Sequence, residues 1–547
     1  MRVPNQGRAW IGVTTKLAMA YGALLGTLAG PLIAQLGPIG LTTEGAQWLD
    51  NQGPSPPGNS GDLFGAAFAV GDFNGDGVDD LAIGVPADRD GSGAPSGSVV
   101  VRHGRRADGL GPVVAVFAGT GGVSSADSGN FGTALAAGDF DGDGFDDLAV
   151  GSPQSPSGSQ YGVVWVYSGS AVGLSGESPD VIDEVVAGGG DHTCPYPYSP
   201  AFGSALAAGD FDADGHADLA ISDPFACERV SESNWVAGGA VFVAHGRANG
   251  LLPFFGYRIS QDSFGIYDAV ESGDFFGAAV AAGDFDADGF DDLAVGVPGE
   301  NQASGAVEIV MGSQWGLIFA NSAFWLPGAL GEEPVTGDSL GLALAAGDFD
   351  GDGFADLAVG SPYRGGTATT IGPGAIDVAY GAPDPWWFDL SRTDRLTQSM
   401  IHGGAAHDGA GDRFGYAFAA GDFDGDGRND LAIGHDLDDW AGTDLGAVTV
   451  IMGAAPSLGA SPRHHLLAIG WEGVPGNPNQ HGQAAGHALG AGDFDGSGHP
   501  DLVIGVPWYD QPGTQNAGAA VVLYSETRVF TDGFETGAMD RWSSALP

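Results

Sequence analysis

The stretch GDFDGDGFDDLAVGSP at residues 138–153 decides the fold, because close copies of it occur seven times in the chain. The aspartates that open the copies stand at residues 72, 139, 210, 284, 348, 422 and 493, so successive copies lie 67, 71, 74, 64, 74 and 71 residues apart. WD40 and kelch repeats are shorter than this. The spacing favours one four-stranded unit per copy and indicates a single large repeat array.

The charge of the chain is strongly acidic. The 547 residues include 69 Asp and Glu against 18 Lys and Arg, which gives a formal net charge of -51. Such a field repels nucleic acid and anionic lipid and attracts cations. Much of the acid lies in the repeated stretch: counted at the first, third, fifth and ninth residues from the opening aspartate, five copies have four carboxylates each and the other two have three. We therefore expect no nucleic-acid partner.

Apolar residues flank each acidic stretch, as at residues 64–70 and 81–84 around the first copy. They predict two strands, A and B, joined by the acidic turn. A third run, such as residues 97–102, predicts strand C, and a fourth, such as residues 112–117, predicts strand D. Strand A is rich in alanine, as expected where seven strands converge on a narrow axis. The sequence thus predicts an all-β protein: a seven-bladed propeller of four-stranded antiparallel blades over residues 35–525.

The last repeat lacks a strong fourth strand after its strand C at residues 518–524. Residues 39–49 precede the first blade at the position that a fourth strand occupies elsewhere. We predict that this N-terminal strand completes blade seven, which removes exposed sheet edges.

The acidic loop between strands A and B has the donors of a calcium site. Side-chain oxygens recur at loop residues one, three, five and nine, as in Asp139, Asp141, Asp143 and Asp147, and Phe145 at residue seven offers its backbone carbonyl. Calcium prefers such an all-oxygen shell, and magnesium is less suited to it. An EF-hand begins with a similar pattern but requires a glutamate at residue twelve and flanking helices. Residue twelve is Ile or Val in every copy, so closure falls to residue nine; an acidic turn without an ion is the alternative interpretation.

We expect up to seven Ca²⁺ ions. Site seven should be the weakest, because Ser497 replaces the acidic fifth residue and Pro500 stiffens the turn. The predicted ligands, with residue seven acting through its carbonyl, are Asp72, Asn74, Asp76, Val78, Asp80; Asp139, Asp141, Asp143, Phe145, Asp147; Asp210, Asp212, Asp214, His216, Asp218; Asp284, Asp286, Asp288, Phe290, Asp292; Asp348, Asp350, Asp352, Phe354, Asp356; Asp422, Asp424, Asp426, Arg428, Asp430; Asp493, Asp495, Ser497, His499 and Asp501.

These residues carry a family resemblance. Each unit opens on Phe-Gly at residues 64, 131, 202, 276 and 414, with Leu340 and Ala485 as substitutes, and strand B closes on Gly-x-Pro in five units. The pattern resembles the FG-GAP repeats of integrin alpha subunits and their bacterial relatives. The resemblance implies calcium loops on a lower rim of the propeller and ligand contacts on the upper one. Ser222-Asp-Pro in unit three and Gly434-His-Asp in unit six depart from the pattern at those turns.

The two ends of the chain differ from the repeats. Residues 1–34 combine Arg2, Arg8 and Lys16 with an apolar run, which is the pattern of a secretory signal peptide cut after Ala34 or Ala29. We therefore expect a secreted, periplasmic or cell-surface monomer with no stable membrane span after cleavage. Residues 526–547, which contain DGFETG, form a C-terminal tail of unassigned role.

Strand direction sorts the remaining loops, because the B-to-C and D-to-A connections lie opposite the acidic loops. Cys194 and Cys227 fall in two such connections and, in an exported protein, are predicted to form a disulfide bond. Tyrosine and tryptophan residues gather on the same upper face, where they either bind sugar rings or a protein partner or simply pack the loops: Tyr196, Tyr198, Trp235, Trp440, Trp508 and Tyr509.

The combined pattern favours a non-enzymatic adhesion or recognition module that binds an extracellular protein or glycan on its upper face. A polysaccharide-acting enzyme or carbohydrate-binding propeller is the alternative. The motif GDSLG at residues 337–341 imitates an esterase nucleophile at Ser339, but the same slot holds GDLFG, GDFFG and GDRFG in other units. His464 and His465 lack the spacing typical of a zinc site.

Overall fold

The computed structural model describes residues 40–50, 61–89, 96–118, 130–153, 162–176, 179–184, 201–231, 234–252, 258–266, 269–327, 335–366, 372–383, 388–402, 409–439, 445–470, 473–477, 482–511 and 514–525. All of them belong to one compact unit, Gly40–Pro547. The predicted signal segment and the C-terminal tail lie outside the described residues.

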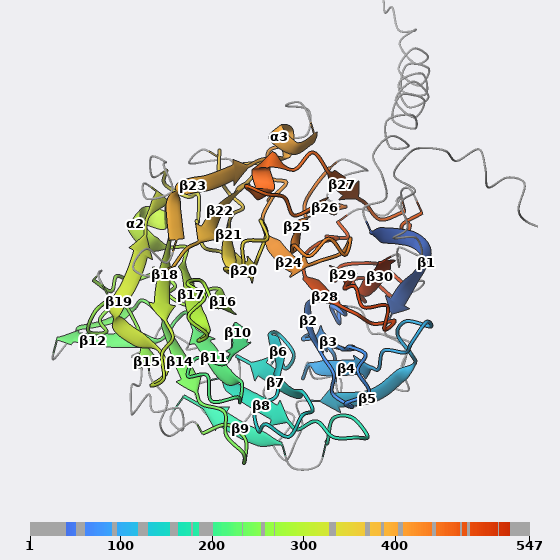
Figure 1. Ribbon diagram of the computed structural model, residues 1–547, viewed down its shortest axis with the longest axis horizontal. Coiled ribbons are helices and arrows are strands. Elements are labelled where there is room, and N and C mark those ends of the chain that lie inside the picture. The colour runs from blue at the N-terminus through green and yellow to red at the C-terminus, as the bar shows by residue number, and fades with distance from the viewer. Residues whose placement is uncertain are drawn as a thin grey trace, which may run out of the picture. The chain divides into compact units, whose positions relative to one another are not determined.

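The described residues form seven four-stranded antiparallel sheets, which surround a central axis (Figure 1). Each sheet follows the predicted order A-B-C-D from the axis outward. The first four are β2 (Ala67–Gly71), β3 (Asp80–Val85), β4 (Ser98–Arg102) and β5 (Val113–Ala118); β6 (Leu135–Gly138), β7 (Asp147–Ser152), β8 (Val163–Tyr167) and β9 (Asp180–Asp183); β10 (Leu206–Gly209), β11 (Asp218–Asp223), β14 (Ala240–Ala244) and β15 (Arg258–Ile259); β16 (Val280–Gly283), β17 (Asp292–Val297), β18 (Ala306–Met311) and β19 (Ile318–Trp325). The last three are β20 (Ala343–Gly347), β21 (Asp356–Ser361), β22 (Ala375–Gly381) and β23 (Phe388–Leu396); β24 (Ala417–Gly421), β25 (Asp430–His435), β26 (Ala447–Ile451) and β27 (His464–Leu467); β28 (Leu489–Gly492), β29 (Asp501–Val506), β30 (Ala519–Ser525) and β1 (Leu41–Asp50).

The innermost strands close the ring. Each strand A contacts the strand A of the next blade, and β28 of blade seven contacts β2 of blade one. Small residues permit this approach: a Cβ atom on Gly138 would lie 3.0 Å from the Cβ of Ala217 and 3.2 Å from that of Ala208 in the next blade. The structure therefore confirms the seven-bladed propeller.

The core lies between blades. Every residue of strand B is buried in all seven blades, because neighbouring blades cover both of its faces. The phenylalanine that follows the first loop aspartate is fully buried in every repeat, at residues 73, 140, 211, 285, 349, 423 and 494. Burial of these rings anchors each acidic loop to the blade that carries it.

Strand β1 is the outermost strand of blade seven. It pairs antiparallel with β30, with Leu41 opposite Ser525 and Asp50 opposite Ala519. The Tyr524 hydroxyl donates a hydrogen bond to Oε1 of Gln47 at 2.8 Å and accepts one from the Leu110 N–H at 3.0 Å. The Tyr524 side chain thus links strands β1 and β30 of blade seven to blade one.

Several elements are additions to the repeat. A hairpin of β12 (Cys227–Ser231) and β13 (Asn234–Ala237) follows strand B of blade three. The short helices are α2 (Glu300–Ala303), α3 (Gln398–His402) and η5 (Leu458–Ala460). Within α2, Asn301 and Gln302 adopt left-handed φ angles of 50° and 64°. These elements leave the four-stranded pattern of their blades unchanged.

Candidate metal sites and the opposite face

Each acidic loop is held in shape by its first aspartate. In blade two, the N–H of Asp143 donates to Oδ1 of Asp139 at 3.1 Å and the N–H of Gly144 donates to Oδ2 at 2.9 Å. The φ angle of Gly144 is 90°, which favours glycine at this position. The same two bonds recur in the other six loops. The loop conformation is therefore formed by the protein's own hydrogen bonds.

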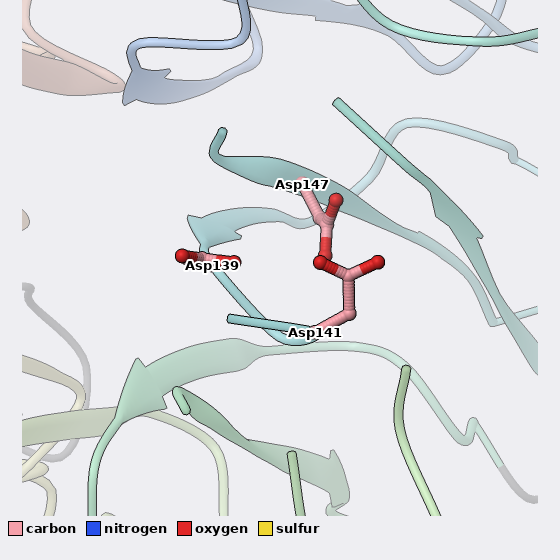
Figure 2. A group of neighbouring side chains, drawn as sticks. All are labelled: Asp139, Asp141 and Asp147. Carbon is pink, nitrogen blue, oxygen red and sulfur yellow. The ribbon is translucent and has the colours of Figure 1, made fainter. Parts of the chain in front are cut away.

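Carboxylates converge within these loops. In each of five loops, three aspartates offer oxygen atoms that all lie within 4.8 Å of one another. Figure 2 shows one such group, in which Asp141 and Asp147 face one another and Asp139 lies beside them. The groups are Asp139, Asp141 and Asp147; Asp210, Asp212 and Asp214; Asp284, Asp286 and Asp292; Asp348, Asp350 and Asp356; and Asp422, Asp424 and Asp430.

The ninth loop residue joins its loop to strand C. Oδ2 of Asp147 accepts a hydrogen bond from the Phe140 N–H at 3.1 Å, and Oδ1 accepts one from the Gly169 N–H, just after β8, at 2.8 Å. The corresponding carboxylates bind the end of strand C in the same way in the other blades. Burial raises the pKa of this carboxyl to about 7 in Asp147 and to about 8 in Asp80, Asp292, Asp356, Asp430 and Asp501.

These features fit a bound cation. Buried, neighbouring carboxylates remain ionised together only where positive charge compensates them. All side-chain donors in the five groups are oxygen atoms, which suits calcium. When bound, the ion would supply the charge that keeps these carboxylates ionised.

Loop residues five and seven are placed differently from loop residues one, three and nine. In blades two, four, five and six, the carboxylate of residue five accepts a hydrogen bond from the N–H of residue seven, as between Asp143 and Phe145 at 3.1 Å. The carboxylate of residue five is not one of the three converging carboxylates of these blades, and in blade three Asp214 takes the place of Asp218. Asp218 there lies 3.2 Å from Nδ1 of His245. Nδ1 of His216 lies 2.9 Å from Oδ1 of Asp214.

Two loops deviate from the common set of donors. In blade one, Nδ2 of Asn74 donates to both oxygens of Asp80, at 3.3 and 3.2 Å. A cation would require the opposite orientation of this amide, with its oxygen facing the site. In blade seven, the Ser497 hydroxyl lies 3.2 Å from the His499 carbonyl, which also accepts from the Ser525 hydroxyl at 3.0 Å. That carbonyl is thus already hydrogen-bonded within the protein.

Arginines contact the loops of blades five and six. Arg392 forms an ion pair with Asp350, and Arg463 forms one with Asp424. Both carboxylates belong to loop residue three, so these guanidinium groups compete with a cation for the same oxygens. The sequence does not indicate these contacts, because each arginine lies about forty residues from its partner and outside the repeated stretch.

The eighth loop residue, whose role was not predicted from the sequence either, joins neighbouring blades. Oδ2 of Asp146 in blade two accepts a hydrogen bond from the Asp72 N–H of blade one at 2.8 Å. Equivalent bonds run from Asp210 N to Asp291, from Asp348 N to the Asn429 side chain, and from Asp493 N to Asp79. The N–H of residue eight also donates to the carbonyl of residue one in the preceding blade at six junctions, and Pro500 has no N–H to donate at the seventh. The repeated Asp-Asp pair was the available sequence signal.

The opposite ends of strands A and B carry the predicted upper-face residues. The ring centroids of Trp508 and His487 are 5.1 Å apart, with the two rings tilted by 55°. Tyr509 contacts Trp48 edge-on at 4.6 Å, and Trp235 lies under the Arg229 guanidinium at 5.9 Å. Tyr196, Tyr198 and Trp440 lie outside the described residues.

Two other predictions concern this face. Cys227 is buried and disulfide-bonded, but Cys194 lies outside the described residues, so the pairing of the two stays a prediction. Ser339 of the GDSLG motif is mostly buried and has a φ angle of 54°, like Phe275 and Arg413 in the same slot of other blades. Its conformation is that of a repeat position.

A comparison with protein families decides the assignment. A model described as the FG-GAP repeat matches seven segments, residues 64–101, 131–167, 202–228, 276–309, 340–374, 414–451 and 485–523. The chain is an FG-GAP repeat protein. Each matched segment begins at the Phe-Gly position before a strand A and covers the acidic loop that follows.

This FG-GAP repeat protein is similar to parts of larger proteins. It is 31% identical to phosphatidylinositol-glycan-specific phospholipase D of Rattus norvegicus over 197 residues, which are 35% of this chain and 22% of that protein. Identity to integrin alpha pat-2 of Caenorhabditis briggsae is 31% over 265 residues (46% and 19%), and to integrin alpha-5 of Xenopus laevis 30% over 245 residues (44% and 20%). The matched region thus spans about a fifth of the length of these relatives. In the described part of this FG-GAP repeat protein, no helix is both long and apolar enough to cross a membrane.

Proposed function

We propose that this protein is an exported, calcium-stabilised recognition module that binds an extracellular protein or glycan on the face opposite its acidic loops and catalyses no reaction. One observation carries the proposal: the acidic loops serve structure. Their carboxylates hold the loop, the end of strand C and the next blade, as Asp139, Asp147 and Asp146 do in blade two. The opposite face is left to loops that differ in length and sequence from blade to blade.

The relatives support this division. Integrin alpha subunits match over nearly half of this chain. Phosphatidylinositol-glycan-specific phospholipase D matches a shorter part, and the matched residues are 22% of that enzyme. The similarity therefore supports a shared propeller, and we assign no hydrolase activity to it.

A binding array tests the proposal. The protein is labelled and applied to arrays of extracellular proteins and glycans, once with calcium and once with EGTA. We expect a ligand that is bound in calcium and lost or weakened in EGTA, with the captured ligand chemically unchanged. Calorimetric titration that detects no calcium binding would refute the proposal, as would cleavage of the captured ligand.

A further inference from the structure

A row of rings crosses the upper face at blades six and seven. The ring centroids of Tyr416 and His487 are 5.1 Å apart, and those of His487 and Trp508 are also 5.1 Å apart. Tyr416 directly precedes β24, while His487 lies just before β28 and Trp508 just after β29. These are the strand ends opposite the acidic loops. All three side chains are partly exposed, and we call them the ring row.

An ion pair with a buried carboxylate lies against the ring row. The Arg413 guanidinium lies 4.3 Å from the Tyr416 ring centroid and donates to Oδ2 of Asp436 at 2.6 Å. Nδ1 of His487 is 2.9 Å from the same oxygen. Asp436 is fully buried, and it occupies the position at which the other six repeats have the proline that closes strand B. The departure of unit six from the Gly-x-Pro pattern thus creates this ion pair.

Two polar atoms of this pair remain without a partner. Oδ1 of Asp436 and Nε of Arg413 are buried and have no hydrogen-bond partner within the part of the chain that the structure describes. Buried polar atoms in folded proteins are nearly always hydrogen-bonded, so such atoms call for a ligand or water. One of them accepts and the other donates, which matches hydroxyl groups, since a hydroxyl does both.

The row of aromatic side chains is specific to blades six and seven of the propeller. The residue that follows Phe-Gly is Ala66, Thr133, Ser204, Ala278 and Leu342 in blades one to five, whereas blades six and seven have Tyr416 and His487. The fold alone therefore does not require rings at these positions.

We propose that the ring row binds a neutral oligosaccharide, whose sugar rings stack on the Trp508 side of the row and whose hydroxyls reach Asp436 and Arg413 as the ligand enters. The inference rests on the proposed function of this face. Ligand sites commonly combine aromatic surface with a few placed polar groups, and aromatic rings bind apolar C–H surfaces. The net charge of -51 disfavours an anionic ligand. A cationic ligand is disfavoured because Arg413 already compensates the charge of Asp436.

The test compares two aromatic residues at the same repeat position. Trp508 and Phe225 both follow the residue that closes strand B, in blades seven and three. Phe225 is 40% exposed and contacts Phe275 edge-on, with ring centroids 5.4 Å apart, far from the ring row in sequence and in a different blade. Wild type, Trp508→Ala, Trp508→Phe and Phe225→Ala are titrated in excess calcium with neutral hexasaccharides of glucose, mannose, xylose and N-acetylglucosamine. Thermal unfolding of each variant checks that the propeller remains folded.

We expect at least one hexasaccharide to bind the wild type, and Trp508→Ala to weaken its binding about tenfold. Trp508→Phe should recover most of the affinity, and Phe225→Ala should leave it unchanged. Equal binding by wild type and Trp508→Ala would overturn the site. Failure of every hexasaccharide to bind the wild type would overturn the proposal that the ligand is a saccharide, and so would a protein ligand whose binding depends on Trp508. In either case, calcium binding and the protein array still test the proposed function separately.

Discussion

Replacing Asp146 with alanine tests the hydrogen bonds between blades. Oδ2 of Asp146 accepts from the Asp72 N–H at 2.8 Å across the junction of blades one and two. Alanine already stands at the same loop position in blades three and five, as Ala217 and Ala355, and both keep the backbone hydrogen bond to the preceding blade. The substitution therefore removes one side-chain acceptor and leaves the backbone geometry intact.

The magnitude follows from the surroundings of the bond. A hydrogen bond to a charged group contributes about 1.5–3 kcal/mol to folding. Burial raises the pKa of Asp146, which shows that desolvation offsets part of this gain. The parallel bond from the Asp146 N–H to the Asp72 carbonyl, at 3.2 Å, is retained. We therefore expect Asp146→Ala to lower the free energy of unfolding by about 1 kcal/mol.

Urea unfolding in excess calcium measures this change. The midpoint should fall while the slope m stays constant, because the same surface is exposed on unfolding. Ala217→Asp is the reciprocal variant: among the described residues, no side chain accepts from the Asp139 N–H, and the new carboxylate should supply that bond and raise the midpoint. Identical midpoints for wild type and Asp146→Ala would refute a stabilising role for the eighth residue.

Three further perturbations have expected outcomes. Removing calcium with EGTA should cost about 1.4 kcal/mol per occupied site, for a dissociation constant of about 0.1 mM at about 1 mM free ion; an unchanged melting temperature in calorimetry would contradict this. Pro500→Asp gives the junction of blades six and seven the N–H and carboxylate that other junctions use, so hydrogen exchange of the β28 amides should slow. Pro500→Ala supplies the N–H alone and should slow this exchange less. Unaltered exchange in both variants would contradict a role of the eighth residue at this junction. Burial, followed by the charge of Asp223, raises the pKa of Glu184 to about 8. The folded state therefore holds this proton more tightly than the unfolded state, and the stability that it contributes is lost as pH rises from about 4.5 towards 8. Glu184→Gln should be increasingly more stable than wild type from pH 5 to pH 8, by roughly 2–4 kcal/mol at the upper end; parallel pH profiles in urea unfolding would show that Glu184 does not titrate this way.

The repeats predicted the propeller because each copy of the repeated stretch contains its own pair of strands. Strands A and B, with the turn between them, lie inside the repeated stretch, so their period and alternation specify a blade. Seven blades follow from seven copies. The β12–β13 hairpin and α2 are single insertions without a repeat to mark them, and composition alone does not distinguish such insertions from loops.

The candidate sites could be predicted only where the residues that form them lie close together in the sequence. Residues one, three and nine of a loop fall within nine positions, and the structure brings them together in at least four blades. Arg392 reaches Asp350 from the outer strand of its blade, and Asp436 meets His487 of the next blade, so both contacts depend on tertiary packing. Spacing along the chain contains no record of such contacts, and only the three-dimensional structure reveals them.

Pairing of β1 with β30 determines when the protein can fold. The first strand ends at Asp50, and its partner is not synthesised until Ser525 has been added. During translation, blade seven therefore has its outer strand but lacks its three inner ones until synthesis is nearly complete, and the propeller stays open until then. Contacts between such distant segments form slowly, and incomplete sheets expose edges that can pair wrongly. Closure of the propeller must consequently await synthesis of almost the whole chain.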